Sequence, residues 1–587
     1  MEQNFFTVQE LLLPGLKFSA PENLYVRLND LVSPNFTARS MRFRVGGTSS
    51  FDTYFNGVSV GTLKRVTIID TLYLRLEGKG RFVLRVGVHR LGHFHRLLYE
   101  QEVTLPLTAP LALPWEALED GMLYVTLEAQ EEAELTGGRF LTSTVPAQEV
   151  KLGAVVTHFN RKAFVVPAIA RMREGLLMQP DIAGKIELII VDNSRNLTEA
   201  EVAGATLIPN LNYGGSGGFS RGLLHLIDNG FTHCLFMDDD ATCEIDSLRR
   251  AYALLRYARK PGVAVCGAQL RESNPWQLHE AGARFEKGRW LPRKHHMDMR
   301  DVHQVLIAER NDMTPNYGGW WFFAFPVNEI KNFPFPFFVR GDDVQFSLQN
   351  GFELIVTNGI CVIAEDFWVK ESPQTRYLSF RATMLVALLN GEQRVSAFIA
   401  IFLVWMLHTL CSYNYASAKA LLLSMRHFMS GPDFFRDNMD MAAVRAEVSE
   451  FRPSEKMLPM SIEDIEVSGE HVYEGRLRRL FRFATVNGNL LPNFMMKCAP
   501  RFQFKHYNAA FRDIFLRREV VYYHEGSGTG YAVRRDQAQF FVLSWEMLKL
   551  SLRLWRKFPA LRSAYLAALP EMTSEQFWRN LYQGKSE

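Results

Sequence analysis

The order of apolar and polar positions changes twice along the chain. Up to about residue 148, short segments rich in β-branched and aromatic residues alternate between apolar and polar positions, as in 81–86 (Arg-Phe-Val-Leu-Arg-Val). Gly, Asn and Pro separate these segments, which is typical of strands and turns in a β-sandwich. We therefore predict an N-terminal β-sandwich over residues 1–148, either a packing module or a glycan-binding module.

A different pattern begins near Lys151, where apolar runs of strand length alternate with helical segments. Residues 152–157, residues 186–193 and the run that ends at Asp238 have the composition of buried strands. Residues 161–177 and 221–229, which lie between them, have helical patterns. The alternation predicts a parallel, doubly wound α/β sheet over residues 149–375.

Residues 376–587 predict a helical C-terminal region, with apolar periodicity through 380–430 and again over 537–554. The longest apolar run, 395–407, has about thirteen residues, whereas a membrane span needs about 20, so we expect a core helix. Four arginines at 476, 478, 479 and 482 adjoin Phe481 and Phe483. This segment predicts either a surface for anionic lipid headgroups or a solvated helix face with core aromatics.

Composition indicates an ordinary globular protein of several domains. The chain has 587 residues, 47% hydrophobic and 22% charged, and its net charge of +3 is too small to indicate nucleic-acid binding. Six scattered cysteines form no CxxC pair, and the N-terminus lacks the pattern of a signal peptide. These features favour a reducing compartment, and we expect a cytoplasmic protein.

The triple aspartate 238–240 is the first candidate for chemistry. It follows the apolar run 235–237, at the carboxyl end of a predicted strand, where open α/β sheets bind ligands. Three neighbouring carboxylates need a cation to offset their repulsion, and oxygen ligands suit Mg²⁺ or Mn²⁺, which then hold substrate phosphates. The alternative is a solvated acidic turn that caps the next helix.

Two further features are consistent with a nucleotide site. The glycine-rich segment 214–218 (Gly-Gly-Ser-Gly-Gly) precedes a helix predicted to start near Phe219, and N–H groups at a helix N-terminus bind anions. It could equally be a flexible turn. Asp192 ends an earlier predicted strand, where nucleotide-binding folds hold a base or ribose, or it caps a helix.

Asp342 and Asp343 follow the apolar run 337–339 and repeat the pattern of the triple aspartate. A glycosyl transfer that inverts the anomeric carbon needs one base for the acceptor hydroxyl, while metal charge helps a nucleotide diphosphate to leave. Two acid clusters at two strand ends would supply both functions. The alternative is an acidic pair at the start of a helix.

Three more residues are weaker candidates. Trp320 and Trp321 follow a segment with two glycines, 316–319 (Asn-Tyr-Gly-Gly), and predict either a platform for sugar rings or core residues. Glu365 follows another predicted strand and is a candidate third metal ligand.

Together these residues resemble the bacterial galactofuranosyltransferases of the mycobacterial cell-wall galactan polymerase type, in the inverting GT-A glycosyltransferase family 2. The resemblance runs nearly end to end. Its blocks are 53–56 (Thr-Tyr-Phe-Asn), 159–161 (Phe-Asn-Arg), 212–221, 235–240, 278–279 (Leu-His), 316–321, 342–343 and the helix 545–556.

The resemblance implies a GT-A core between an N-terminal β-sandwich and a helical C-terminal region. It also implies a UDP-galactofuranose donor, Mn²⁺ or Mg²⁺, and a growing glycan on a lipid carrier as acceptor. Family members can form oligomers at the membrane surface, so a homo-oligomer peripheral to the inner face of the cytoplasmic membrane is expected.

By position, the resemblance implies a role for each site residue. Metal contacts are expected from Asp238, Asp240 and Glu365, and catalysis from Asp343 as the base with Asp342 beside it. Donor contacts are expected from Arg161 and Asp192, both at the uridine, and from Asn212, Gly215, Ser216, Gly217 and Asp239. Acceptor or sugar contacts are expected from Trp320, Trp321 and His279.

Three positions depart from the family pattern. Glu365 stands where the family has a metal-binding histidine, which adds negative charge and could change the metal preference. Ala283 replaces an acidic residue thought to touch the acceptor, although Glu280 is near, and Gly341 replaces a tryptophan. The last two lie on the expected acceptor side, so the acceptor and the linkage are not carried over.

We therefore predict an inverting, metal-dependent glycosyltransferase that adds galactofuranose to a surface polysaccharide such as an O-antigen, a capsule or a galactan. One alternative is the same machinery with another UDP-sugar. The other is a glycan-binding scaffold with a decayed transferase core.

Overall fold

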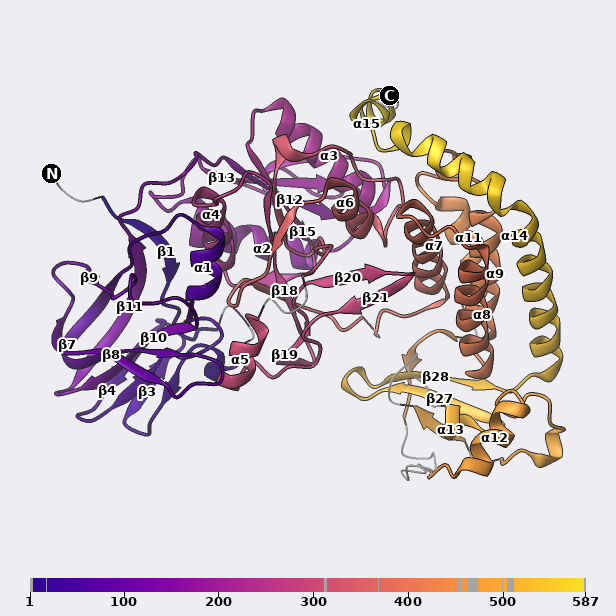
Figure 1. Cartoon of the computed structure of the whole chain (residues 1–587), viewed down its shortest axis with the longest axis horizontal. Helices are drawn as coiled ribbons and strands as arrows, with labels where there is room; N and C mark the ends of the chain where they lie inside the picture. The colour runs from indigo at the N-terminus through magenta and orange to yellow at the C-terminus, as the bar shows by residue number, and fades with distance from the viewer. Residues whose placement is uncertain are drawn as a thin grey trace.

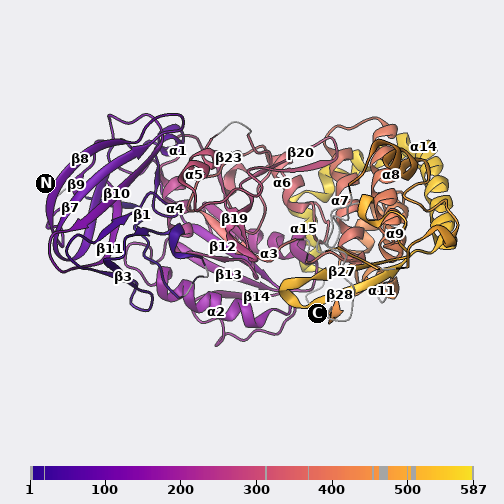
Figure 2. The same cartoon turned by 90° about the horizontal axis from the view of Figure 1, so that it is seen from below.

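The computed structural model describes the chain except for residues 1–3, 17, 19, 311–313, 368, 452–454, 462–472, 499, 504–510 and 585–587. Trp368, which belongs to the segment that carries Glu365, therefore lies outside the described residues. A β-rich N-terminal part, a mixed α/β centre and a mainly helical C-terminal part follow one another along the long axis (Figure 1). The view from below shows the same order (Figure 2).

The N-terminal part is organised around the long strand β7 (Tyr73–His89). Its first half pairs with β11 (Ala133–Thr142), and its second half pairs with β10 (Met122–Ala129) and β8 (Arg96–Leu105). Where the halves meet, Gly78 has φ +149°, and a Cβ there would lie 2.1 Å from the carbonyl oxygen of Glu134. A glycine is therefore required at this crossing. The strands join into one eleven-stranded antiparallel network, with further strands β1 (Phe6–Glu10), β2 (Arg27–Leu28), β3 (Val32–Asn35), β4 (Ser40–Phe43), β5 (Thr48–Ser50), β6 (Val58–Ser59) and β9 (Leu111–Ala112).

The centre is built on a seven-stranded sheet that confirms the predicted α/β pattern. In spatial order its strands are β14 (Thr206–Pro209), β13 (Ile186–Asp192), β12 (Leu152–His158), β15 (His233–Asp238), β22 (Phe323–Pro326), β17 (Val263–Cys266) and β23 (Glu353–Ile355). All run parallel except β22, which is antiparallel to both of its neighbours. The carboxyl ends of β12, β13 and β15 therefore meet at one edge of the sheet.

Helices and a smaller sheet complete the centre. The helices are α2 (Lys162–Met172), α3 (Gly214–Asp228), α4 (Asp246–Arg256), α5 (Val302–Ala308) and α6 (Asp342–Asn350). The smaller sheet has the order β16 (Thr242–Cys243), β24 (Cys361–Ala364), β18 (Ala268–Arg271) and β19 (Asn274–Glu280). A hairpin of β20 (Ala283–Glu286) and β21 (Arg289–Pro292) extends toward the C-terminal helices (Figure 1).

The C-terminal part is mainly helical, and the 36-residue α14 (Gln537–Met572) runs along its outside (Figure 1). The others are α7 (Pro373–Leu389), α8 (Val395–Cys411), α9 (Tyr415–Phe428), α11 (Ala442–Phe451), α12 (Arg476–Ala484) and α15 (Glu575–Gln583), beside the hairpin β27 (Glu519–His524) and β28 (Thr529–Arg534). The apolar run 395–407 lies in α8, where Phe398, Phe402 and Met406 are fully buried. Within the described residues, no helix combines the length and the apolar character that a membrane crossing requires.

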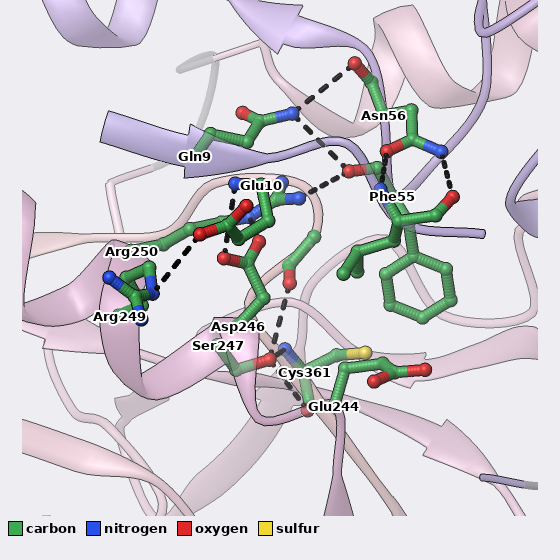
Figure 3. A network of polar contacts seen from close by, with 12 residues as sticks. Gln9, Glu10, Phe55, Asn56, Glu244, Asp246, Ser247, Arg249, Arg250 and Cys361 are labelled. Atoms are coloured by element: carbon green, nitrogen blue, oxygen red, sulfur yellow. Dashed lines mark hydrogen bonds and ion pairs between the residues drawn. The ribbon is translucent and has the colours of Figure 1, made fainter. Parts of the chain in front are cut away.

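A polar network connects the N-terminal part to α4 (Figure 3). The backbone N–H of Glu10 donates to Asp246 at 3.2 Å, and the Arg249 guanidinium lies 3.6 Å from the Glu10 carboxylate. Arg250 donates to the carbonyl oxygen of Phe55. Through these contacts one face of α4 holds the N-terminal part against the central sheet.

Candidate active site

The triple aspartate lies where the sheet places it, at the carboxyl end of β15. The register pairs Thr157 of β12 with Asp238, so the first carboxyl of the cluster is still within the sheet. Burial raises the pKa of Asp238 to about 7, with repulsion from Asp240 and Asp239 adding to the shift. An added cation would lower this pKa, because it would favour the charged form.

Two basic side chains already balance part of this negative charge. An Arg161 guanidinium nitrogen lies 2.6 Å from the Asp240 carboxylate and 3.1 Å from that of Asp239. Lys370 donates to Asp240 at 2.8 Å. Burial alone would raise the pKa of Asp240, but Lys370 and Arg161 outweigh it and the pKa is lowered. Lys370 had no candidate role in the sequence, because a lone lysine in a loop carries no recognisable pattern.

Strand pairing brings Glu365 to the same place. β16 and β24 pair antiparallel, with Thr242 opposite Ile363, so Asp240 shortly before β16 and Glu365 directly after β24 lie at neighbouring strand ends. The Lys370 ammonium is 3.8 Å from the Glu365 carboxylate. Lys370 therefore lies between Asp240 and Glu365, two of the predicted metal ligands.

The oxygen donors of these carboxylates suit a hard divalent cation. Their oxygen atoms are the ligands that Mg²⁺ and Mn²⁺ prefer, and such ions usually complete their coordination with water and substrate phosphates. Among the described residues no three His, Cys, Asp or Glu side chains converge on one point. A metal bound here would therefore need ligands from the substrate as well as movement of Lys370.

His158 is a site residue that the sequence did not reveal. It ends β12, is fully buried, and contacts Asp239 at 3.2 Å through Nδ1 and Asn196 at 3.0 Å through Nε2. Burial alone would lower the pKa of His158, but these hydrogen bonds and the charges of Asp239 and Asp192 raise it. Its place at the end of β12, beside the strand that carries the triple aspartate, is the signal that could have identified it.

Asp192 is almost fully buried, at 1% exposure, and its carboxylate is occupied by its own loop. It accepts hydrogen bonds from the N–H and hydroxyl of Ser194 and from the N–H groups of Asn196 and Leu197, all at 2.8–2.9 Å. Burial raises the pKa of Asp192, but these bonds outweigh it and the pKa is lowered. The next element after Asp192 is β14 and not a helix, so the helix-cap alternative is wrong. The carboxylate instead orders the loop that follows β13, and contact with a nucleoside stays a prediction.

The glycine-rich segment differs from its prediction. α3 begins at Gly214, five residues before the expected start at Phe219, so 214–218 form its first turns. A Cβ at Gly214 would lie 2.1 Å from the carbonyl oxygen of Phe338, and one at Gly218 would lie 2.2 Å from Thr157. These glycines allow the helix to pack closely against protein, and their approach to a ligand remains a prediction.

The start of α3 also reaches the second acid cluster. Ser216 donates a hydrogen bond to Asp342 at 3.0 Å, and Gly215 lies close to the same carboxylate. Asn212 accepts from the N–H of Gly214 at 3.1 Å, and the carbonyl oxygen of Gly217 accepts from Tyr582 of α15 at 2.6 Å. Four of the predicted donor-binding residues therefore lie at the start of α3, between the sheet, the paired acids and α15. They are Asn212, Gly215, Ser216 and Gly217.

The sequence predicted that the paired acids follow a strand, and this prediction is wrong. Asp342 and Asp343 are the first two residues of α6, as in the alternative interpretation. Phe338, Arg340 and Gly341 before them have positive φ angles of 74°, 70° and 83°, which a continuous strand excludes.

Burial raises the pKa of both carboxyls of this pair. Burial and repulsion from Asp343 raise the pKa of Asp342 to about 7. Burial also raises that of Asp343, to about 6, against opposing contributions from the N–H of Val344 and the charge of Arg340. Burial thus moves both carboxyls of the pair toward neutrality, the range in which a carboxylate can serve as a base.

Phe367 connects the predicted acceptor residues. Its ring centroid lies 4.9 Å from that of His279 and 6.2 Å from that of Trp321. Arg340, from the turn before the paired acids, lies 5.0 Å over the same ring. Because Phe367 follows Glu365 by two residues, one loop contributes to both halves of the site.

Trp320 is placed in the core, whereas Trp321 is half-buried. The Trp320 ring is 5% exposed and makes edge contacts with Phe219, Phe236 and Phe346. This burial corrects the expectation that both tryptophans form an open sugar platform. Trp321 donates to the carbonyl oxygen of Gly267 at 2.9 Å, and its contact with a sugar stays a prediction.

Comparison with known proteins identifies relatives over nearly the whole chain. Galactofuranosyltransferase GlfT2 of Mycolicibacterium smegmatis is 24% identical over 597 residues, which cover 91% of this chain and 88% of the relative. The GlfT2 of Mycobacterium tuberculosis is 24% identical over 592 residues, with 92% and 91% covered. Residues 518–584, from β27 through α15, match the family model of galactofuranosyltransferase-2, domain 3.

Among solved structures, the crystal structure of GalNAc-T7 with UDP, GalNAc and Mn²⁺ is 10% identical and has a TM-score of 0.30. It covers 41% of this chain, and the match covers 48% of that chain. The sequence relatives are thus the informative ones. Over about nine-tenths of its length, this chain is similar to the galactofuranosyltransferases GlfT2.

Proposed function

We propose that this protein is an inverting, metal-dependent galactofuranosyltransferase that transfers galactofuranose from UDP-galactofuranose to a growing surface polysaccharide. The names of the sequence relatives support galactofuranose as the transferred sugar. The observation that carries the mechanism is that the start of α3 lies between two acid clusters. Gly218 packs on Thr157, the register partner of Asp238, and Ser216 donates to Asp342, while Arg161 and Lys370 contact the triple aspartate.

The triple-aspartate side would bind the donor. Asp238 and Asp240, with Glu365, would hold Mn²⁺ or Mg²⁺, which when bound neutralises charge on the departing diphosphate. Arg161 would exchange its contacts with Asp239 and Asp240 for the nucleotide, because guanidinium groups bind phosphate and carboxylate oxygens alike. His158 would keep Asp239 in place, since it holds that carboxylate from the buried side.

The α6 side would deprotonate the acceptor. Asp343 would take the proton of the acceptor hydroxyl as that oxygen bonds to the anomeric carbon of the donor. Asp342, held by Ser216, would keep the first turn of α6 fixed. His279, Phe367 and Trp321 would contact the sugar through their ring faces, which suit the C–H surfaces of sugars.

The proposal extends to the architecture. We assign residues 149–375 to a GT-A core, residues 1–148 to a β-sandwich domain and residues 376–587 to a helical domain. The mixed seven-stranded sheet with ligand-binding groups at its carboxyl edge supports the first assignment. The antiparallel network around β7 supports the β-sandwich assignment for residues 1–148, because a sheet that curves or folds over on itself forms two packed layers.

The C-terminal part supports a peripheral position at the inner face of the cytoplasmic membrane and assembly into a homo-oligomer. Along α14 an apolar stripe is exposed, with Trp545 at 63% and Trp555 at 57%. On α12, Leu477 and Leu480 are 85% and 67% exposed beside the arginines of that helix. Exposed apolar surface of this extent is typical of contact with lipid or another chain.

A donor panel tests the function. The purified protein with Mn²⁺ and a galactofuranose-containing acceptor should release UDP from UDP-galactofuranose and much less from UDP-galactopyranose, UDP-glucose or UDP-N-acetylglucosamine. Preference for another UDP-sugar would support the same machinery with a different donor. Glycan binding without UDP release from any donor would instead support the scaffold alternative.

A further inference from the structure

Lys370 lies inside the acid cluster on the donor side of the site, and the proposed function gives it no role. It belongs to the connection 365–372 between β24 and α7. Its ammonium donates to Asp240 at 2.8 Å and lies 3.8 Å from the Glu365 carboxylate. Among the described residues, these are the only carboxylates within 4 Å of it. Lys370 therefore connects two residues that are predicted to hold the metal.

The contact between Lys370 and Asp240 excludes a divalent cation from the same carboxylates. Only 16% of the Asp240 side chain is exposed, so little water screens the charges there. Like charges that approach one another in such a place repel strongly. Binding of Mn²⁺ or Mg²⁺ by Asp240 and Glu365 therefore requires that the Lys370 ammonium leaves them.

The displaced ammonium finds no free acid on its own connection. Asp366 accepts a hydrogen bond from Arg271, and the Glu371 carboxylate lies 3.1 Å from the Arg376 guanidinium. Both carboxylates are thus already paired. Because an unpaired charge in a partly buried site is costly, a ligand that brings its own negative charge is the remaining partner for Lys370.

The ends of the connection are fixed, so the side chain of Lys370 is the part that can move. On one side, β24 pairs with β18 as far as Ala364. On the other side, Ser372 and Thr375 form a capping box that holds the first turn of α7. The flexible four-carbon stem of a lysine can redirect its ammonium without a change in these elements.

We propose that Lys370 is a diphosphate-binding residue of the donor site, which balances the charge of Asp240 in the free protein and moves to the diphosphate when the donor and a divalent cation bind. A lysine ammonium binds phosphate oxygens as a point charge. The inference rests on the proposed function, and it adds the residue that couples metal binding to donor binding.

This exchange gives Lys370 opposite effects on the two ligands. Without nucleotide, Lys370 competes with the cation for Asp240 and weakens the binding of the metal. With nucleotide, its ammonium contacts the diphosphate and strengthens the binding of the donor. A residue with these two effects makes each ligand favour the other, which is a coupling free energy between metal and donor.

The test uses isothermal calorimetry on the full-length protein and Lys370→Met, whose unbranched side chain has no charge. Without nucleotide, the variant should bind Mn²⁺ about tenfold more tightly than the wild type. With saturating Mn²⁺, it should bind UDP about tenfold more weakly, as expected for one lost charged contact. Lys370→Arg, which keeps the positive charge, should stay close to the wild type in both titrations.

Lys260→Met is the matched control. The Lys260 ammonium lies 2.8 Å from the Glu353 carboxylate, the same distance as in the pair of Lys370 with Asp240. Glu353 begins β23, whereas the acid cluster lies at the carboxyl edge of the sheet. Loss of the Lys260 pair should therefore leave the affinities for Mn²⁺ and for UDP unchanged.

Three outcomes would overturn the proposal. Weaker binding of both Mn²⁺ and UDP by Lys370→Met would show that Lys370 only maintains the shape of the site. Unchanged Mn²⁺ affinity without nucleotide would exclude competition for Asp240, and unchanged UDP affinity with Mn²⁺ would exclude a contact with the diphosphate. A wild-type protein that binds no UDP in the presence of Mn²⁺ would instead contradict the proposed function itself.

Discussion

At the scale of single residues, local contacts give the acids of this site different pKa shifts. Arg161 and Lys370 lie against Asp240 and lower its pKa, whereas Asp342 and Asp343 have raised values because burial exceeds their stabilising contacts. A permanently charged carboxylate suits a cation, and one with a pKa near neutrality suits proton transfer. Asp238 departs from this division, because burial raises its pKa to about 7, and a bound cation would favour its charged form.

Replacement of Asp343 tests the base. Asp343→Asn keeps the shape of the side chain but cannot accept the acceptor proton, so kcat should fall by about 10²- to 10⁴-fold. UDP affinity, measured by calorimetry with Mn²⁺, should change little, because the donor is held at the other acid cluster. Transfer at close to the wild-type rate would remove Asp343 from the mechanism.

Asp240→Asn tests the metal side. In the wild type, chelation of the metal should weaken UDP binding. The variant should bind UDP about 10- to 150-fold more weakly than the wild type with Mn²⁺, and Mn²⁺ should not improve its binding, since a lost charged contact costs about 1.5–3 kcal/mol. Asp433→Asn, an acid in the C-terminal part whose side chain is 75% exposed, is the control. Equal stimulation of UDP binding by Mn²⁺ in wild type and Asp240→Asn would rule out this ligand.

At the scale of elements, continuous apolar runs were sufficient to predict β12, β13 and β15 and the acids that end β13 and β15, because both faces of a central parallel strand are buried. The start of α3 and the turn before α6 were not predictable in the same way. Glycines disfavour helices locally, yet α3 needs them for close packing. The positive φ angles of Phe338 and Arg340 arise from tertiary contacts that local sequence does not express.

His158 and Lys370 show the same limit within the site. Neither belongs to an acidic cluster or a repeated pattern, and each becomes informative only when the strands are paired. Phe367 was visible beside Glu365 in the sequence, but its contacts with His279 and Trp321 depend on the loop after β24. The chemistry of the site was therefore more predictable than the residues that orient it.

The packing of α3 predicts a large effect of a small substitution. A Cβ at Gly222 would lie 2.2 Å from a methyl group of Val155 in β12, so Gly222→Ala should lower the free energy of unfolding by about 1–3 kcal/mol. Gly262→Ala is the control, because nothing lies within 4 Å of a Cβ there. Urea unfolding should separate the two variants, and equal stabilities would contradict the close contact.

At the scale of the whole molecule, the end of the chain returns to the centre. Helix α15 packs on α3, and its Arg579 pairs with Asp228 at the end of α3 at 2.6 Å. Its Trp578 donates to the carbonyl oxygen of Pro334, in the segment before α6, at 2.9 Å. Figure 1 shows α14 running along the outside of the C-terminal part before α15 turns back. The C-terminal part thus supports the helix whose first turn contacts Asp342.

Two tryptophans of the C-terminal part allow a matched test of this support. Trp578 is fully buried and Trp545 of α14 is 63% exposed. Trp578→Ala should lower the free energy of unfolding by about 3–5 kcal/mol and reduce transfer with it, whereas Trp545→Ala should leave stability nearly unchanged. Similar unfolding curves for both variants would show that α15 does not stabilise the centre.

The central claim is the transfer of galactofuranose, and mass spectrometry of the product tests it most directly. The wild-type protein with Mn²⁺, UDP-galactofuranose and a galactofuranose disaccharide acceptor should yield acceptor extended by one or more hexose units, and Asp343→Asn should yield none. An unextended acceptor in the wild-type reaction, while another UDP-sugar is transferred or no donor is consumed, would contradict the account.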